Sequence, residues 1–170
     1  MPTKPSIIKN MKKYLILFSV LLAIGACNTL TSAQRTERDA LKAQAVEKVL
    51  AKRHYVVDID MMYPTGAPAK RLTSDYIIKV EGDTLTSYLP YFGTAYDAPY
   101  NGGNFMDFKE PIKEYKTEQV KKNKTRITIK ADHESDHLTY TLEVFDNGNV
   151  SLNVISSRRQ SINFNGTLRD

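Results

Sequence analysis

Most of the chain after His54 alternates between apolar and polar residues with a period of two. In residues 138–144, for example, Leu, Tyr, Leu and Val alternate with Thr, Thr and Glu. Because successive side chains of a β-strand point to opposite faces of a sheet, this alternation predicts antiparallel strands with one buried face. The pattern recurs in residues 57–63, 76–80, 85–89, 126–130, 138–144, 150–154 and 161–164.

Short polar turns separate these segments. Gly82 and Asp83 divide one pair of strands, and Asn147-Gly148, in which both residues tolerate a positive φ angle, divides another. Residues 121–124 and 156–160 are two further polar turns. Successive hairpins at this spacing predict an antiparallel meander of about eight or nine strands. A sheet of that size either curls into an open barrel or splits into two packed layers.

A helix is predicted ahead of the strands, at residues 36–53. This segment lacks Gly and Pro and is rich in Ala, Glu, Lys and Leu, which favour helices. An apolar stripe at helical spacing is expected to pack against an open end or one face of the sheet. The stripe consists of Leu41, Ala45, Val46, Val49 and Leu50. The predicted fold class is therefore mainly β, with one N-terminal helix (α+β).

Residues 1–27 have the pattern of an export signal. Lys12 and Lys13 precede an apolar run at residues 14–24. The run is shorter than the roughly 20 apolar residues that span a bilayer, so it indicates a secretory signal peptide. Residues 1–10 lack this character, which makes Met11 the expected natural start.

The end of the signal, Ile24-Gly25-Ala26-Cys27, resembles a bacterial lipobox. Cys27 is the only cysteine of the chain, and in this motif its thiol accepts a lipid that anchors the protein to a membrane. Residues 28–34 then form a tether, and residues 35–170 form a single β-rich domain. We expect an outer-membrane lipoprotein that faces the periplasm. The alternative is cleavage after Ala33, which yields a secreted soluble periplasmic protein.

The net charge of +5 gives no support to nucleic-acid binding. Four of the lysines precede Cys27 in a segment without acidic residues, so 20 basic and 19 acidic residues remain after its removal. A nearly neutral domain gives no electrostatic indication of an anionic partner. With 25% charged and 41% hydrophobic residues the composition is globular, and a single cysteine excludes a disulfide framework.

Residues 133–137 read His-Glu-Ser-Asp-His and match the letters of the zinc-protease motif H-E-x-x-H. That chemistry needs a helix, on which both imidazoles share one face, and a third ligand. Strand-like segments flank the motif here, so it is expected on a polar hairpin turn. We therefore expect no catalytic residue and no cofactor. The alternative is a small metal-dependent hydrolase that uses His133, Glu134 and His137.

The most unusual stretch is residues 88–100, which holds four Tyr, one Phe and two Pro. A tyrosine pairs a flat apolar ring with a polar tip, which suits the binding of sugars or aromatic ligands. The alternative is a proline-stiffened loop whose rings fold over the end of the sheet and complete the core. The candidate ligand-binding residues are Tyr88, Tyr91, Phe92, Tyr96 and Tyr100.

Five segments of the chain carry a family resemblance. The most specific contains Leu-Pro-Tyr-Phe-Gly at residues 89–93, and the others are residues 76–80, 98–100, 145–148 and 162–166. Together they resemble an uncharacterised family of Bacteroidetes secreted proteins and lipoproteins, the domain of unknown function 4251. The resemblance implies a single domain in the cell envelope and brings no assigned activity or site residues.

The sequence as a whole favours a non-catalytic envelope lipoprotein domain. Its expected partner is an unidentified small molecule, glycan or envelope protein that contacts the aromatic loop. A purely structural envelope component is a further alternative.

Overall fold

The structure is a computed structural model that describes residues 31–96 and 106–169. The chain divides into two units, Met1–Thr36 and Glu37–Asp170, and the second contains all the strands. The described helix is α2 (Ser32–Ala51). The described strands are β1 (His54–Tyr63), β2 (Lys70–Glu81), β3 (Thr84–Tyr88), β4 (Asp107–Pro111), β5 (Glu114–Lys121), β6 (Lys124–His133), β7 (Asp136–Phe145), β8 (Asn149–Ser156) and β9 (Ile162–Leu168).

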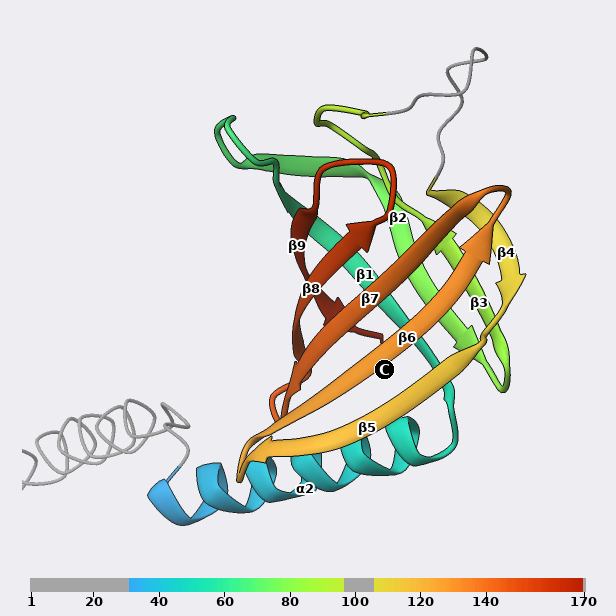
Figure 1. Cartoon of the computed structure of the whole chain (residues 1–170). Coiled ribbons are helices and arrows are strands. Elements are labelled where there is room, and N and C mark those ends of the chain that lie inside the picture. Colours follow the sequence, from blue (N-terminus) through green and yellow to red (C-terminus); the bar gives the residue numbers. More distant parts are fainter. Residues whose placement is uncertain (1–30, 97–105, 170) are drawn as a thin grey trace, which may run out of the picture. The chain divides into compact units, whose positions relative to one another are not determined.

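The nine strands of the described ranges form one antiparallel sheet in the order β4-β3-β2-β1-β9-β8-β7-β6-β5. The edge strands β4 and β5 are joined by residues 112 and 113 alone, so the sheet must curl until its two edges approach each other (Figure 1). Lys113 N donates to Lys130 O at 2.8 Å, and Ile112 N donates to Asp83 O at 2.7 Å. The prediction of a mainly β meander of eight or nine strands is confirmed. Of the two predicted forms, an open barrel or two packed layers, the sheet takes the first, as a half-barrel.

The interior of the half-barrel is filled with side chains rather than open. Tyr140 and Phe164 both have no exposed surface, and all but one of the strands contribute buried apolar residues around them. Tyr140 OH donates to Ser87 Oγ at 3.1 Å, which satisfies the one polar group of this large buried ring. Burial raises the pKa of the Tyr140 hydroxyl well above its ordinary value.

The positions of strand β1 that face the core shift by one residue partway along the strand. The alternation of apolar and polar residues did not predict this shift. A register shift lies between Ile59 and Met61 in the pairing with both neighbours. A β-bulge of this kind adds one residue and moves the following side chains to the other face. Met62 is consequently buried and Tyr63 is 37% exposed, the reverse of the predicted pattern.

Helix α2 begins earlier than predicted and packs only through its C-terminal end. Leu50 is buried, and Val46 and Val49 pack against the core. Leu41 is 59% exposed, so the prediction that the whole apolar stripe packs is wrong. The helix ends at Ala51, and Arg53 follows with a φ of 50°. Within the described ranges, no helix combines the length and apolar character that crossing a membrane requires.

Candidate functional site

The first half of the aromatic loop is part of the fold. Leu89 is fully buried, and its N donates to Met106 O at 3.2 Å. Tyr91 OH lies 3.0 Å from Thr94 O and 3.1 Å from Gln160 O, both of which can accept its proton. Burial raises the pKa of the Tyr91 hydroxyl, which keeps it a donor. Tyr91 therefore holds the loop in place rather than facing a ligand.

Residues 94–96 of the aromatic loop are tied to the β8–β9 connection, residues 157–161. Tyr96 N donates to Arg158 O at 2.8 Å, and Gln160 N donates to Thr94 O at 3.0 Å. Ala95 forms an isolated antiparallel bridge with Arg159 between these two bonds. The loop thus has a fixed backbone on both sides of Phe92.

Three of the predicted aromatic residues are exposed to solvent: Tyr88 ends β3, and Phe92 and Tyr96 lie on the loop that follows. Tyr88 is 38% exposed, Phe92 is 50% exposed and Tyr96 is 71% exposed. The Phe92 ring lies 4.4 Å from Lys70 Nζ, a cation–π distance. We call Tyr88, Phe92 and Tyr96 the aromatic rim. Tyr100 lies outside the described residues.

A buried carboxylate anchors the connection on which the aromatic loop rests. Asp136 is 8% exposed and begins β7. Its Oδ2 accepts from Ser156 Oγ at 2.6 Å, and its Oδ1 accepts from Ser157 N at 3.0 Å and Ser157 Oγ at 2.8 Å. Ser157 Oγ in turn accepts from His137 N at 3.1 Å. Three donors on one buried carboxylate compensate for the loss of its hydration.

The two histidines of the H-E-x-x-H letters lie on opposite faces of the β6–β7 hairpin. His133 pairs with Asp136 across the hairpin and His137 pairs with Asp132, and neighbouring pairs face opposite ways. His133 Nδ1 lies 3.1 Å from Glu110 Oε1, and its ring stacks on Phe108 at a centroid distance of 4.6 Å. This placement explains why a match in letters does not give a zinc site.

His137 has its own partner. Its Nδ1 lies 2.9 Å from Asp132 Oδ1, and Lys113 Nζ contacts the other oxygen of that carboxylate. The hydrogen bonds from Lys113 and His137 hold the pKa of Asp132 below its ordinary range. Over residues 31–96 and 106–169, no group of three or more His, Cys, Asp or Glu is arranged to hold a metal ion. Cys27, the predicted lipid site, lies outside those ranges.

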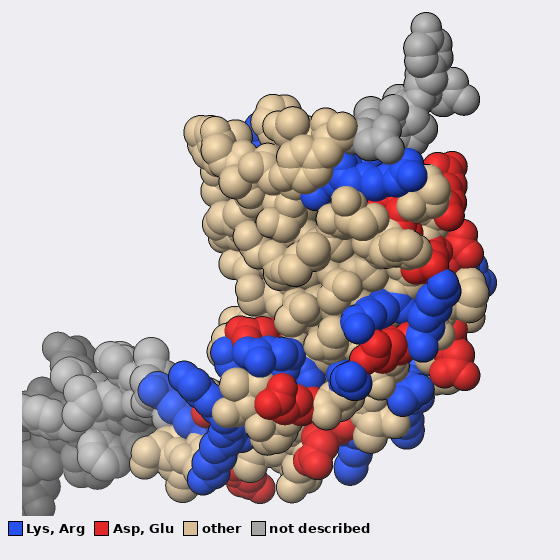
Figure 2. Space-filling view, viewed as in Figure 1, with Lys and Arg blue, Asp and Glu red and all other residues tan. Residues whose placement is uncertain are grey.

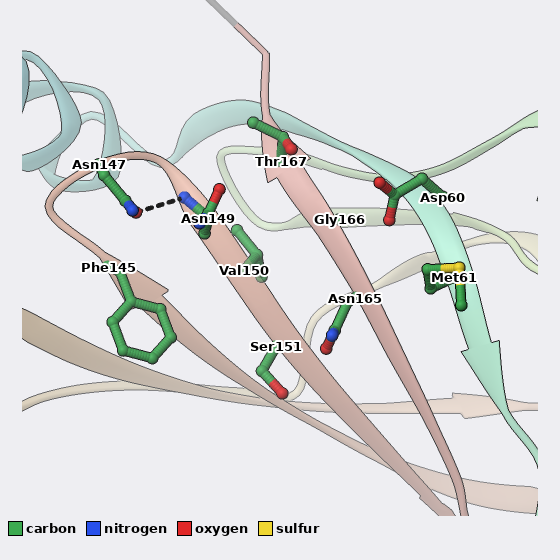
Figure 3. Close-up of a pocket in the computed structure, with 10 residues that line it drawn as sticks. All are labelled: Asp60, Met61, Phe145, Asn147, Asn149, Val150, Ser151, Asn165, Gly166 and Thr167. Atoms are coloured by element: carbon green, nitrogen blue, oxygen red, sulfur yellow. Dashed lines mark hydrogen bonds between the residues drawn. The ribbon is translucent and has the colours of Figure 1, made fainter. Parts of the chain in front are cut away.

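Two adjacent hollows, which the sequence did not predict, lie on the outer face of the sheet. The first, shown in Figure 3, has a volume of about 600 Å³, and the second has a volume of about 470 Å³. Ser151 lines both, so we treat them as one feature and call it the outer trough. In the sequence, the trough corresponds to a run of uncharged polar residues at the outward positions of β8 and β9. Such a run was not recognised as a site because it resembles ordinary solvated surface.

The fold and its surface define a curled antiparallel half-barrel domain with a filled core. The chain belongs to the DUF4251 family, a domain of unknown function, whose model matches residues 37–168. The family resemblance inferred from the sequence is thereby confirmed. A comparison with curated proteins finds no match for this chain.

A solved structure supports the fold. It is the crystal structure of a DUF4251 family protein from Bacteroides eggerthii DSM 20697 at 1.95 Å resolution. The two chains are 14% identical, with a TM-score of 0.58 over 78% of this chain and 89% of that chain. At this identity the likeness establishes the shared fold alone.

Proposed function

We propose that this protein is a non-catalytic envelope lipoprotein whose domain binds a ligand or envelope partner through the aromatic rim. Cys27 carries the lipid that holds the chain at the outer membrane, on the periplasmic side. The domain then presents Tyr88, at the end of β3, and Phe92 and Tyr96, on the loop that follows, to the partner. This proposal combines the lipobox in the sequence with the exposure of the rim.

The binding role rests on one observation: three large aromatic side chains are exposed, one at the end of β3 and two on the loop that follows. Of six exposed large hydrophobic side chains among the described residues, the rim supplies three. The three lie within nine consecutive residues of the chain, and exposed apolar surface of this kind is typical of binding sites. Aromatic residues are also the most frequent source of binding energy at interfaces.

The hydrogen bonds that hold the loop also favour a binding role. Tyr91 and the backbone bonds at residues 94–96 and 158–160 order the loop before any partner arrives. A surface that is already ordered loses little conformational entropy on binding, which improves affinity. A loop that only completed the core would bury Phe92 and Tyr96 instead.

Photo-crosslinking in cells tests the proposal. A benzophenone amino acid is placed at Phe92 or at Tyr96, and at Thr117 on the outer edge strand β5 as a matched exposed control. We expect discrete crosslinked species at residues 92 and 96 that are absent at residue 117. Mass spectrometry of the crosslinked mature chain should find an N-terminal Cys27 that carries lipid.

Two results would count against this function. Identical crosslinks at all three positions would show that contact is non-specific. A mature chain that begins after Ala33 without lipid would remove the anchor while leaving the role of the rim open to the crosslinking result.

A further inference from the structure

The outward positions of β8 and β9 carry no charged residue, although charged residues make up 25% of the chain. Figure 2 shows uncharged surface over β8 and the neighbouring part of β7, whereas charged residues gather toward β5 and α2. The outward residues are Asn149, Ser151, Asn153 and Ile155 on β8 and Asn163, Asn165 and Thr167 on β9. These residues make this part of the outer face uncharged and rich in amides.

Strand register arranges these residues in two rows that cross five strands. Cross-strand pairs place the members of each row directly beside one another. Five strands at a spacing of about 4.8 Å give each row a length of about 19 Å. One row is Tyr63, Asn163, Asn153, Thr141 and Thr128, and the other is Met61, Asn165, Ser151, Glu143 and Arg126.

The outer trough follows these two rows. Its first hollow is lined from four strands, with Phe145 at one side and Met61 at the other (Figure 3). Among the described residues that line this hollow, Asp60 is the only charged one. Its second hollow adds Thr141, Asn153 and Asn163. The trough is therefore an elongated, open, polar surface with apolar groups at its margin.

The charges in the second hollow are already compensated. Glu143 Oε2 accepts from Lys124 Nζ at 2.8 Å, and Glu143 Oε1 accepts from Arg126 Nη2 at 2.9 Å. These two hydrogen bonds lower the pKa of Glu143, which keeps it ionised and paired. Arg126 Nη1 also lies 3.8 Å from Glu118 Oε2, so the two cations are matched by two carboxylates. Because neither sign of charge is then in excess, the hollow does not select an ionic ligand.

The neutral side chains of the trough are suited to a ligand rich in hydroxyl groups. Each Asn amide both donates and accepts, and the Ser and Thr hydroxyls do the same. Asn153 Nδ2 donates to Asn163 Oδ1 at 2.8 Å, and Asn165 Nδ2 donates to Tyr63 OH at 3.1 Å. These bonds orient three of the amides, each of which keeps a further donor or acceptor position for a ligand.

We propose that the outer trough binds a neutral oligosaccharide that lies across strands β1, β9, β8, β7 and β6. The sugar hydroxyls exchange hydrogen bonds with the amides and hydroxyls of the two rows. The Phe145 ring offers an apolar face to the C–H side of a sugar ring. No residue of the aromatic rim lines the trough, and the proposed site does not depend on what the rim binds.

The test uses the isotope-labelled full chain and nuclear magnetic resonance titration. The probes are maltohexaose, cellohexaose and mannohexaose, with hexagalacturonate as the anionic comparison. We expect at least one neutral hexasaccharide to shift resonances of trough residues in a saturable way. Asn165→Ala and Thr141→Ala should each raise its Kd about fivefold, because each removes a hydrogen-bonding group. Thr117→Ala on β5 makes the same chemical change as Thr141→Ala outside the trough and should leave the Kd unchanged.

Three results would overturn the inference. The first is that no neutral hexasaccharide shifts trough resonances up to about 10 mM, which is weaker than a specific site. The second is that the shifts lie elsewhere on the domain. The third is that hexagalacturonate binds in the trough as tightly as the neutral sugars. The spectra of the variants also report their folding, so loss of binding is separated from loss of structure.

Discussion

Replacing Gly166 with alanine should lower the free energy of unfolding by about 3 kcal/mol. Gly166 lies in β9 opposite Ile59, beside the bulge of β1. A Cβ atom at this position would lie 2.0 Å from Asp58 O and 2.9 Å from Asp58 C. Both contacts are with backbone, which cannot move without separating β1 from β9. Since this pairing joins the two halves of the sheet, the cost is large. Chemical denaturation of the purified variant measures it.

The control for this substitution is Thr167→Val, at the next residue of the same strand. Thr167 is exposed, and valine keeps its branched shape, so the expected change is within about 0.5 kcal/mol. If Gly166→Ala and Thr167→Val lowered the free energy of unfolding equally, the close approach of β1 and β9 at Gly166 would be contradicted.

Replacing Asp136 with alanine should cost about 3 kcal/mol, because several donors lose a buried charged acceptor. Ser156 Oγ, Ser157 Oγ and Ser157 N all donate to this carboxylate. The variant should also exchange the amide hydrogens of Tyr96 and Gln160 faster, since these amides lie where the β8–β9 connection meets the aromatic loop. Denaturation and hydrogen exchange on the same sample provide both readouts.

Asp132→Ala is the matched control on the same hairpin. Asp132 contacts Lys113 and His137, but its side chain is 28% exposed. A surface ion pair of this kind contributes about 0–1 kcal/mol. If Asp136→Ala and Asp132→Ala lower the free energy of unfolding by the same amount, the hydrogen bonds of Asp136 do not anchor the β8–β9 connection.

The alternation of apolar and polar residues predicted most of the sheet correctly. Residues at the inward positions of β7 and β8, such as Leu142 and Leu152, are fully buried as expected. The prediction works there because each strand has one face against a filled core and the other in water. It fails at the β1 bulge, where one extra residue reverses the faces, because no local pattern marks a bulge.

The edge strands were harder to predict for a different reason. Strand β5 is largely exposed on both faces, so its sequence, from Glu114 to Lys121, shows little alternation. The pairing of β1 with β9 joins segments about a hundred residues apart, and local spacing carries no information about such a partner.

The candidate sites, too, depend on contacts that local sequence spacing does not reveal. The sequence identified the aromatic loop but did not separate Tyr91, which packs, from Phe92 and Tyr96, which are exposed. The match to H-E-x-x-H singled out His133 and His137. In the same segment, however, it is Asp136 that accepts hydrogen bonds from Ser156 and Ser157. The outer trough depends on register across five strands and therefore became visible only in the folded sheet.

The central claim is that the rim aromatics serve binding and are not needed for folding. Its most direct test is the free energy of unfolding of the double variant Phe92→Ala/Tyr96→Ala, compared with Tyr91→Ala. We expect the double variant to lose at most about 1 kcal/mol, mainly from the Lys70 contact with the Phe92 ring. Tyr91→Ala should lose about 2 kcal/mol, because its hydroxyl and half-buried ring hold the loop. A loss above about 2 kcal/mol in the double variant would show that the rim completes the core, and would contradict the account.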